Sequence, residues 1–368
     1  MIYFDSAATT LQKPKSVAAA AAKAIATMTT PGRGDSAASR QAADTMLQLR
    51  TKAASFFGVD SAERVVLTMN ATHGLNVAIK SLVSPGARVV ISGYEHNAVT
   101  RPLHALGAET VIVNGELFRP EQMAEGFERS VTENTAAVVC NHVSNVFGYT
   151  LPVDDIADIC RSRGVPLIVD ASQSAGILPV DVGRWDAAFA ACPGHKGLYG
   201  PQGTGLLLCG RDVRTLPLLE GGTGSLSRQQ DMPESLPDRL EAGTPNVHGA
   251  AGLLEGLNFV ESFMPGDISR YEGSLMSALA EGLKKTGRFR VLDDPGGQGS
   301  VLSVVPVGQD VGVLADYLAE KGVAVRAGLH CAPLAHQSGG TLGTGTIRFS
   351  ASVFNTISEV EQVLALLK

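Results

Sequence analysis

Residues 167–173 have the sequence LIVDASQ, an apolar run that ends in Asp170. Such a run is typical of a buried parallel strand, and its last side chain emerges at the carboxyl edge of the sheet, where open α/β sheets bind their ligands. An Asp that ends a strand also caps a following helix in many proteins. The pattern alone therefore leaves two interpretations of Asp170, a helix cap and a ligand for a bound group.

A second apolar run, at residues 185–191, leads to GHK at residues 194–196 and then to a glycine-rich turn. A lysine in this position can hold pyridoxal 5′-phosphate as a Schiff base, and it reacts only as the neutral amine, with a pKa depressed by burial or positive charge. The alternative is a surface lysine in a turn. The presence of Asp170 favours the interpretation of Lys196 as a cofactor lysine, because a carboxylate against the pyridine nitrogen makes the cofactor ring a better electron sink. Gln173 is expected to reach the ring hydroxyl if the chain turns helical there.

Strands alternate with helical patterns over much of the chain. We expect strands at residues 64–69, 88–91, 110–113, 136–140, 167–169 and 205–209, and helices at residues 17–28, at 72–83, from 97 and at 246–263. This alternation predicts an α/β fold with a largely parallel sheet and helices on both faces. Residues 220–238, rich in Gly, Ser, Pro and Gln, predict a long loop.

Composition narrows the class of protein. The 368 residues, 44% hydrophobic, fit one large and one smaller domain. A net charge of −6 without a basic cluster disfavours nucleic-acid binding and anionic membranes. No apolar run approaches the roughly 20 residues of a membrane span. Five cysteines without a Cys-x-x-Cys pair indicate a reducing cytoplasm and no metal site, and four of them are expected to be buried: Cys140, Cys160, Cys192 and Cys209.

Taken together, these segments resemble those of the class V aminotransferases among the fold-type I pyridoxal-phosphate enzymes, and most closely the cysteine desulfurase and selenocysteine lyase branch. The resemblance runs from YFDSAATT at residues 3–10 to IRFS at 347–350, and its most specific segments are VDASQ (169–173), GHK (194–196), EAGTPN (241–246) and RAGLHCA (326–332). It implies a large domain, residues 15–259, with a mainly parallel seven-stranded sheet. It also implies a smaller α+β domain, residues 1–14 and 260–368.

The resemblance implies which residues hold the cofactor. Thr72, between a strand and a helix whose N-terminus suits a phosphate, contacts the phosphate, with a plain capping role as the alternative. His73 and His195 belong to the same cofactor-binding set, His195 at the phosphate. His96 is expected to stack on the pyridine ring and relay protons, the alternative being a solvated loop histidine.

Two further residues extend the site by the same resemblance. Asn145 hydrogen-bonds the cofactor hydroxyl or the substrate carboxylate. Thr244 reaches the phosphate of a second copy, which implies a homodimer with shared active sites.

The substrate end contains two arginines and a cysteine. Arg348 alternates with apolar neighbours, and its planar fork suits the α-carboxylate of an amino acid; without the resemblance a surface role would be the default. Arg326 matches a second family arginine near the substrate. Transamination needs no thiol, whereas desulfuration needs one to take the substrate sulfur as a persulfide and release alanine. Cys331 is the expected acceptor rather than an inert cysteine, and Arg326 and His330 are expected to favour its thiolate.

The chain departs from the family at two positions. Pro193 stands where a Ser or Thr often contacts the phosphate, and it has neither a hydroxyl nor an N–H donor. Ser36 stands where a histidine is common, in the loop of residues 33–36.

The first functional hypothesis is a cysteine desulfurase that converts L-cysteine to L-alanine and supplies sulfur to an acceptor protein, for iron–sulfur or other sulfur biosynthesis. The alternatives are a selenocysteine lyase, another class V lyase or aminotransferase, and a non-catalytic partner-binding member of the family. Intact Lys196, Asp170 and Cys331 disfavour the last.

Overall fold

The structure is a computed structural model that describes residues 1–32 and 34–368. Its centre is a seven-stranded sheet in the order β2-β8-β7-β6-β5-β3-β4, in which β8 alone runs antiparallel to both of its neighbours. The strands are β2 (Val65–Thr68), β3 (Arg88–Ser92), β4 (Glu109–Val113), β5 (Ala137–Asn141), β6 (Leu167–Asp170), β7 (Phe189–Pro193) and β8 (Gly205–Cys209). The predicted α/β class and mainly parallel sheet are confirmed.

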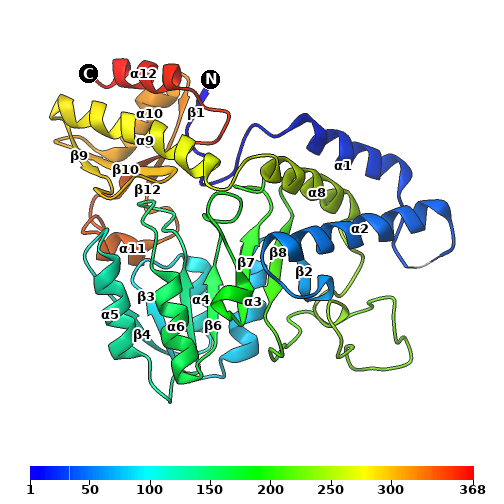
Figure 1. Ribbon diagram of the computed structural model, residues 1–368. Coiled ribbons are helices and arrows are strands. Elements are labelled where there is room, and N and C mark those ends of the chain that lie inside the picture. Colours follow the sequence, from blue (N-terminus) through cyan, green and yellow to red (C-terminus); the bar gives the residue numbers. More distant parts are fainter. Residues whose placement is uncertain (33) are drawn as a thin grey trace.

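Figure 1 shows the helices of this part of the chain packed around the sheet. They are α1 (Lys15–Thr27), α2 (Ala37–Phe56), α3 (Ala71–Leu82), α4 (Asn97–Ala105), α5 (Pro120–Ser130), α6 (Val153–Arg163), α7 (Val182–Trp185) and α8 (Val247–Glu261). Helix α1 lies on the outside, against α8. Strands β5, β6, β7 and β8 are buried along their whole length, which explains their nearly continuous apolar sequences. The expected loop is also present, because residues 210–237 contain neither helix nor strand.

A smaller α+β unit lies at one end of the large sheet and contains both termini (Figure 1). Its antiparallel sheet has the order β12-β13-β10-β9, and β1 pairs with β11 beside it. The elements are β1 (Ile2–Tyr3), α9 (Asp267–Thr286), β9 (Phe289–Leu292), β10 (Val301–Pro306), α10 (Val311–Glu320), β11 (Val323–Ala324), β12 (Arg326–Gly328), α11 (Pro333–Ser338), β13 (Thr346–Ser350) and α12 (Ile357–Leu366). The domain limits at residues 15 and 259 stay a prediction.

The turn after β7 is glycine-rich because its backbone is tightly enclosed. A Cβ atom on Gly194 would lie 2.2 Å from the hydroxyl oxygen of Thr204, and one on Gly197 would lie 2.5 Å from the carbonyl oxygen of Ala175. Neither position has room for a side chain. Lys196, between them, is therefore held in a fixed backbone path.

Burial of the cysteines follows the sequence pattern. The four cysteines in or next to apolar runs are buried, and Cys331 is exposed, as expected. In the described part of the chain, every helix is too short or too polar to cross a membrane.

An ion pair joins α2 to the segment that follows the long loop. Arg50 donates from both terminal nitrogens to the two carboxylate oxygens of Glu241, at 2.8 and 2.6 Å, and the backbone N–H of Leu67 in β2 donates to the same carboxylate. Both side chains are largely buried, with 10% and 14% exposed.

We expect Glu241→Ala to lower the free energy of unfolding by roughly 3 kcal/mol, because it leaves the Arg50 charge buried without its partner. Urea denaturation would measure the loss. The control is Glu261→Ala, which removes the more exposed partner of Lys52 and should cost less than about 1 kcal/mol. Equal losses for the two variants would contradict the assigned role of the Arg50–Glu241 pair.

Candidate active site

A cavity at the carboxyl ends of β5, β6 and β7 brings together most of the predicted side chains. Its walls include Thr72, His96, Asn145, Asp170, Gln173, His195 and Lys196. These residues come from segments up to 124 residues apart in the chain, yet each follows a strand of the same sheet. Parallel strands place such segments at one edge, which is where the sequence predicted a ligand site.

Lys196 lies in this cavity with an altered ionisation. The pKa of its ammonium group is lowered to about 8: burial is the main cause, the Asp170 carboxylate opposes it, and the nearby Arg348 and Arg326 act in the same direction as burial. The depressed pKa agrees with the expectation for an amine that must react in its neutral form.

Asp170 ends β6 and is 5% exposed. One carboxylate oxygen accepts a hydrogen bond from the backbone N–H of Ser172 at 2.9 Å, so Asp170 closes a turn instead of capping an α-helix. Gln173 donates its amide N–H to the carbonyl oxygen of Ala7 at 3.0 Å. Its carbonyl oxygen and its second amide N–H remain for a ligand.

Two histidines in the cavity have lowered pKa values. His96 caps α4, and its Nδ1 accepts from the backbone N–H of Ala98 at 3.0 Å, which leaves the ring proton on Nε2. Burial lowers the pKa of His96, although Asp170 opposes that shift. Burial also lowers the pKa of His195 to about 4, and its Nδ1 has no partner within the described residues.

The N-terminus of α3 forms one wall of the cavity. Asn70 caps this helix by accepting from the backbone N–H of His73 at 2.9 Å. The preceding amides of the first turn lack partners inside the helix, and they provide the partial positive charge that suits a phosphate. Thr72 is exposed at this point and lines the cavity.

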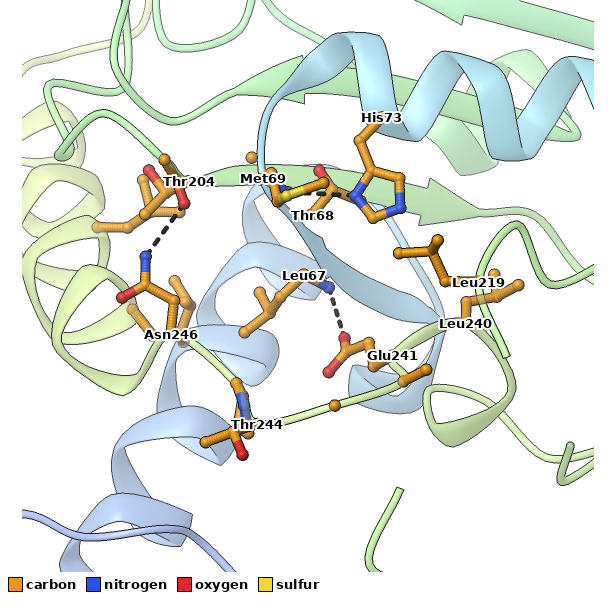
Figure 2. A pocket seen from close by; sticks show the side chains of 18 residues that line it. Leu67, Thr68, Met69, His73, Thr204, Leu219, Leu240, Glu241, Thr244 and Asn246 are labelled. Atoms are coloured by element: carbon orange, nitrogen blue, oxygen red, sulfur yellow. Dashed lines mark hydrogen bonds between the residues drawn. The ribbon is translucent and has the colours of Figure 1, made fainter. Parts of the chain in front are cut away.

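His73 and Thr244 line a different cavity, shown in Figure 2. It measures about 230 Å³ and lies on the other side of the β2–α3 turn. Burial lowers the pKa of His73 there, against the opposing effect of Glu241. The structure therefore places the predicted cofactor residue His73 in the wall of the cavity that Thr244 also lines, instead of in the wall of the Lys196 cavity.

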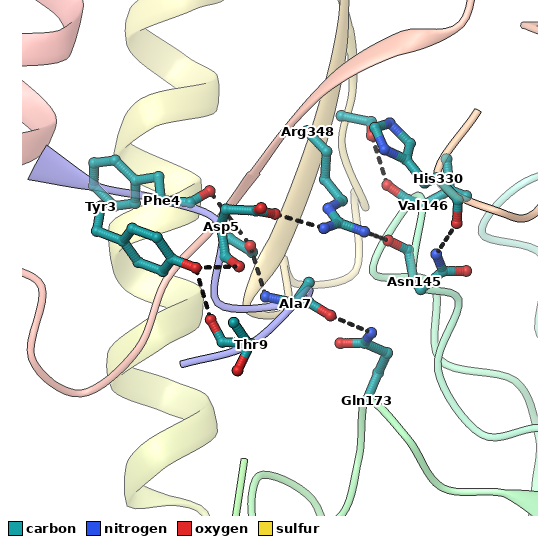
Figure 3. A network of polar contacts seen from close by, with 12 residues as sticks. Tyr3, Phe4, Asp5, Ala7, Thr9, Asn145, Val146, Gln173, His330 and Arg348 are labelled. Atoms are coloured by element: carbon teal, nitrogen blue, oxygen red, sulfur yellow. Dashed lines mark hydrogen bonds and ion pairs between the residues drawn. The ribbon is translucent and has the colours of Figure 1, made fainter. Parts of the chain in front are cut away.

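Arg348 and Arg326 stand directly opposite each other in β13 and β12. Arg348 is 2% exposed. It donates from Nη2 to the carboxylate of Asp5 at 2.7 Å and from Nη1 to the carbonyl oxygen of Asn145 at 3.0 Å (Figure 3). Arg326 is exposed. Both guanidinium groups lower the pKa of Lys196, but neither side chain lines the Lys196 cavity.

Asn145 connects the cavity to the cysteine segment. Its Nδ2 donates to the carbonyl oxygen of His330 at 2.9 Å, while its Oδ1 is buried without a partner in the described residues. This acceptor is positioned for a hydroxyl group of a ligand.

Cys331 lies in a turn with an unusual backbone. Ala332 N–H donates to the carbonyl oxygen of Leu329 at 2.8 Å, and the two central residues, His330 and Cys331, have φ values of 49° and 56°. Left-handed residues at both central positions define a type I′ turn, which normally uses Asn and Gly. The carbonyl oxygen of Cys331 accepts from the backbone N–H of Asn97 at 2.8 Å, so the turn is attached next to His96.

His330 is not a source of positive charge for Cys331, and that expectation was wrong. Burial, with a smaller effect from Arg348, lowers the pKa of His330 to about 2. Its Nε2 is 2.9 Å from the hydroxyl oxygen of Thr346, which in turn lies 3.1 Å from that of Ser303. Because Ser303 donates to the carbonyl oxygen of Val146, Thr346 donates to Ser303 and His330 donates to Thr346. The ring is a neutral anchor for the turn.

A family model described as "Aminotransferase class-V" matches residues 2–363. The chain belongs to this family.

Relatives within the class-V aminotransferases have a common description. The chain is 30% identical to a probable cysteine desulfurase of Mycolicibacterium paratuberculosis, covering 99% of the chain but 54% of that relative. It is 32% identical to a cysteine desulfurase of Pectobacterium atrosepticum, covering 99% of the chain and 92% of the relative. A solved cysteine desulfurase structure from Thermococcus onnurineus NA1 matches with a TM-score of 0.90 and 30% identity, covering 100% of this chain and 93% of that one. The resemblance deduced from sequence is confirmed.

The two departures from the family pattern have local consequences. Pro193 ends β7 and lines the Lys196 cavity as an apolar wall. Ser36 caps α2 by accepting from the backbone N–H of Ser39 at 3.1 Å, so its hydroxyl serves the helix. Arg33 of the same loop lies outside the described residues.

The cavity fits the cofactor that the resemblance implies. It offers a carboxylate at Asp170, an amine at Lys196, an unpartnered acceptor at Asn145 and a helix N-terminus at Thr72. These groups match, in kind, an aromatic nitrogen, an aldehyde, a hydroxyl and a phosphate.

The sequence reasoning missed Asp5. Asp5 does lie in the first segment of the family resemblance, at residues 3–10. Nothing in that segment indicates that its carboxylate contacts Arg348, which is 343 residues away in the chain.

In the cofactor-free protein we expect amine-reactive labelling of Lys196 to show a midpoint near pH 8. Asp170→Asn should move the midpoint lower, because the neutral amide no longer stabilises the ammonium form. Competitive labelling followed by peptide mass spectrometry would measure both midpoints. A midpoint near 10.5 in the unaltered protein, the ordinary value for lysine, would contradict the burial of this amine.

Proposed function

We propose that the protein is a pyridoxal-phosphate-dependent cysteine desulfurase that converts L-cysteine to L-alanine and leaves a persulfide on Cys331. The observation that carries this proposal is the attachment of an exposed cysteine to the Lys196 site. Cys331 is held through its carbonyl oxygen by Asn97, and the preceding carbonyl oxygen is held by Asn145, a residue of the Lys196 cavity. A transaminase has no use for a thiol in this place.

The proposed roles follow from the geometry of the cavity. Pyridoxal phosphate, when bound, supplies an electron sink for the electrons released at the substrate α carbon. Lys196 as the neutral amine binds the cofactor aldehyde and moves the proton at the α carbon, and Asp170 holds the proton on the ring nitrogen. His96 would cover the ring of the bound cofactor, Asn145 and Gln173 would hold its hydroxyl, and Thr72 and His195 would hold its phosphate. Arg348 and Arg326 supply the positive charge that attracts the substrate carboxylate.

Sulfur transfer needs one bond to form and one to break. The thiolate of Cys331 forms a bond to the substrate sulfur, while the bond between that sulfur and the substrate β carbon breaks. The electron pair of the broken bond stays with the carbon skeleton, which takes up a proton and leaves as L-alanine. The persulfide on Cys331 then passes to a sulfur-acceptor protein, with the cytoplasm as the proposed location.

The test is incubation with L-cysteine and a thiol reductant. The unaltered protein should release alanine and sulfide in equal amounts, and without reductant the Cys331 peptide should gain the mass of one sulfur. Cys331→Ala should lower both products at least about 100-fold, because the substrate sulfur has no nucleophile to receive it. Cys160→Ala is the matched control, because Cys160 is a buried cysteine of α6, and this variant should keep the unaltered rate.

Other results would favour the alternatives. Sulfide release by Cys331→Ala at the unaltered rate would exclude Cys331 as the acceptor and favour a class-V lyase or aminotransferase. Release of selenide from L-selenocysteine at a rate far above that of sulfide from L-cysteine would favour a selenocysteine lyase.

We also propose a homodimer in which a second copy covers the cavity of Figure 2. Thr244 borders this cavity, and the apolar side chains of Met69 and Leu219 in its wall are 55% and 54% exposed. Exposed apolar side chains around a cavity favour a protein partner. In such a dimer Thr244 contacts the cofactor phosphate of the partner subunit.

Shared sites make a specific prediction for mixed subunits. Lys196→Ala and Thr244→Asp should each be inactive alone, the second because a carboxylate repels the phosphate. Subunits exchanged at equal amounts should recover about one quarter of the unaltered activity, because half of the dimers are mixed and each has one intact site. Failure to recover activity, with exchange shown by native mass spectrometry, would contradict shared sites.

A further inference from the structure

Arg348 offers almost no surface to a carboxylate that arrives from solvent. Nη2 donates to Asp5 and Nη1 donates to the carbonyl oxygen of Asn145, which uses two of the five N–H groups of the guanidinium. The third, Nε, is buried with no partner among the described residues. The side chain as a whole is 3% exposed. The Nη2 hydrogen that Asp5 accepts becomes available to a substrate carboxylate only after Asp5 has moved.

Asp5 is the partner that is free to move. Its side chain is 19% exposed, whereas the other acceptor on Arg348 is a backbone carbonyl that cannot leave without unfolding its segment. The backbone around Asp5 is fixed, because Ser350 N–H donates to the carbonyl oxygen of Phe4 at 2.8 Å and Ser6 N–H donates to that of Ser350 at 3.3 Å. A rotation of the Asp5 side chain would therefore free the Nη2 hydrogen without a change in the backbone.

The positive charges of Arg348 and Arg326 explain why a carboxylate lies beside Arg348. Arg326 lies directly opposite Arg348 in the antiparallel pair of β12 and β13, and like charges in that arrangement destabilise a sheet. The single negative charge of Asp5 offsets part of this repulsion. The α-carboxylate of an amino acid carries the same charge, so exchanging one for the other leaves the charge of the site unchanged.

We propose that Asp5 is an internal substitute for the substrate carboxylate: it occupies Arg348 in the absence of substrate and rotates away when the carboxylate of the amino acid takes its place. Asp5 is thus a positioning residue, which keeps the Arg348 guanidinium oriented and neutralised between turnovers. The proposal rests on the proposed function in that Arg348 binds the substrate carboxylate. Its first test does not need turnover.

The first test is chemical rescue of stability. Asp5→Ala leaves a buried cation with an empty space beside it, and the variant should melt at a lower temperature than the unaltered protein. Sodium acetate or L-alanine at tens of millimolar should raise that melting temperature by at least about 3 °C, because a ligand that binds only the folded state stabilises it. Sodium chloride at equal ionic strength should give no such rise, and the unaltered protein should not respond to acetate.

The second test uses a variant that keeps the shape of the side chain. Asp5→Asn retains an oxygen acceptor for Arg348 but removes the competing charge. With L-cysteine as substrate, its KM should fall at least about fivefold, with a smaller change in kcat, because the substrate no longer displaces a carboxylate. In the cofactor-free variant, the labelling midpoint of Lys196 should also move lower, because Asp5 raises the pKa of that amine.

The outcomes separate this proposal from a purely structural role. If Asp5 only braces Arg348, the KM of Asp5→Asn rises and acetate does not stabilise Asp5→Ala; either result overturns the substitute role. The surface variant Asp60→Ala, which removes a partner of Arg64 and Arg211, is the control for unspecific effects of acetate. If the unaltered protein released no alanine or sulfide while acetate still rescued Asp5→Ala, the proposed function would fail and the role of Asp5 at Arg348 would stand.

Discussion

The loss of water around the Lys196 ammonium group is the constraint on which the rest of the site depends. A buried charge without compensation is costly, and the group responds by giving up its proton more readily. Its pKa of about 8 is the balance between that burial, two arginines that lower it and two carboxylates that raise it. The glycines on either side of the lysine are part of the same constraint, because a side chain at Gly194 or Gly197 would collide with Thr204 or Ala175 and push the turn away from the strand ends.

Local sequence was enough to predict the strands and the side chains at their ends. The runs that became β6 and β7 are buried throughout, so their apolar patterns left little choice of structure, and Asp170 and Lys196 follow them at the predicted edge. Contacts between distant segments were not predictable in this way. The apolar patterns predict which side chains follow the strands at the carboxyl edge of the sheet. They do not predict that Gln173 donates to Ala7 or that Arg348 donates to Asp5. The neutral state of His330 depends on its burial, and its ring is hydrogen-bonded to Thr346 of β13; no local pattern reveals either feature.

Thr72 and His73 line different cavities for a simple geometric reason. Both lie in the first turn of α3, where consecutive side chains point about 100° apart. One therefore lines the Lys196 cavity and the other lines the neighbouring cavity with Thr244 and Glu241. A motif read as a single unit in sequence is divided between two surfaces by the helix that begins inside it, and the ion pair between Glu241 and Arg50 holds the second surface in place.

The turn that carries Cys331 determines how sulfur could leave the site. Two consecutive non-glycine residues with positive φ cost on the order of 1–2 kcal/mol each. Three hydrogen bonds offset that cost: Ala332 to Leu329 within the turn, Asn97 to the carbonyl oxygen of Cys331, and Asn145 to that of His330. The last two attach the turn to two segments that line the Lys196 cavity, one at His96 and one at Asn145. A thiol on such a turn has little freedom to travel, and its side chain is exposed. The backbone of Cys331 is held through its own carbonyl group and through that of His330. Under the proposed function, a sulfur-acceptor protein must therefore approach Cys331 at the surface.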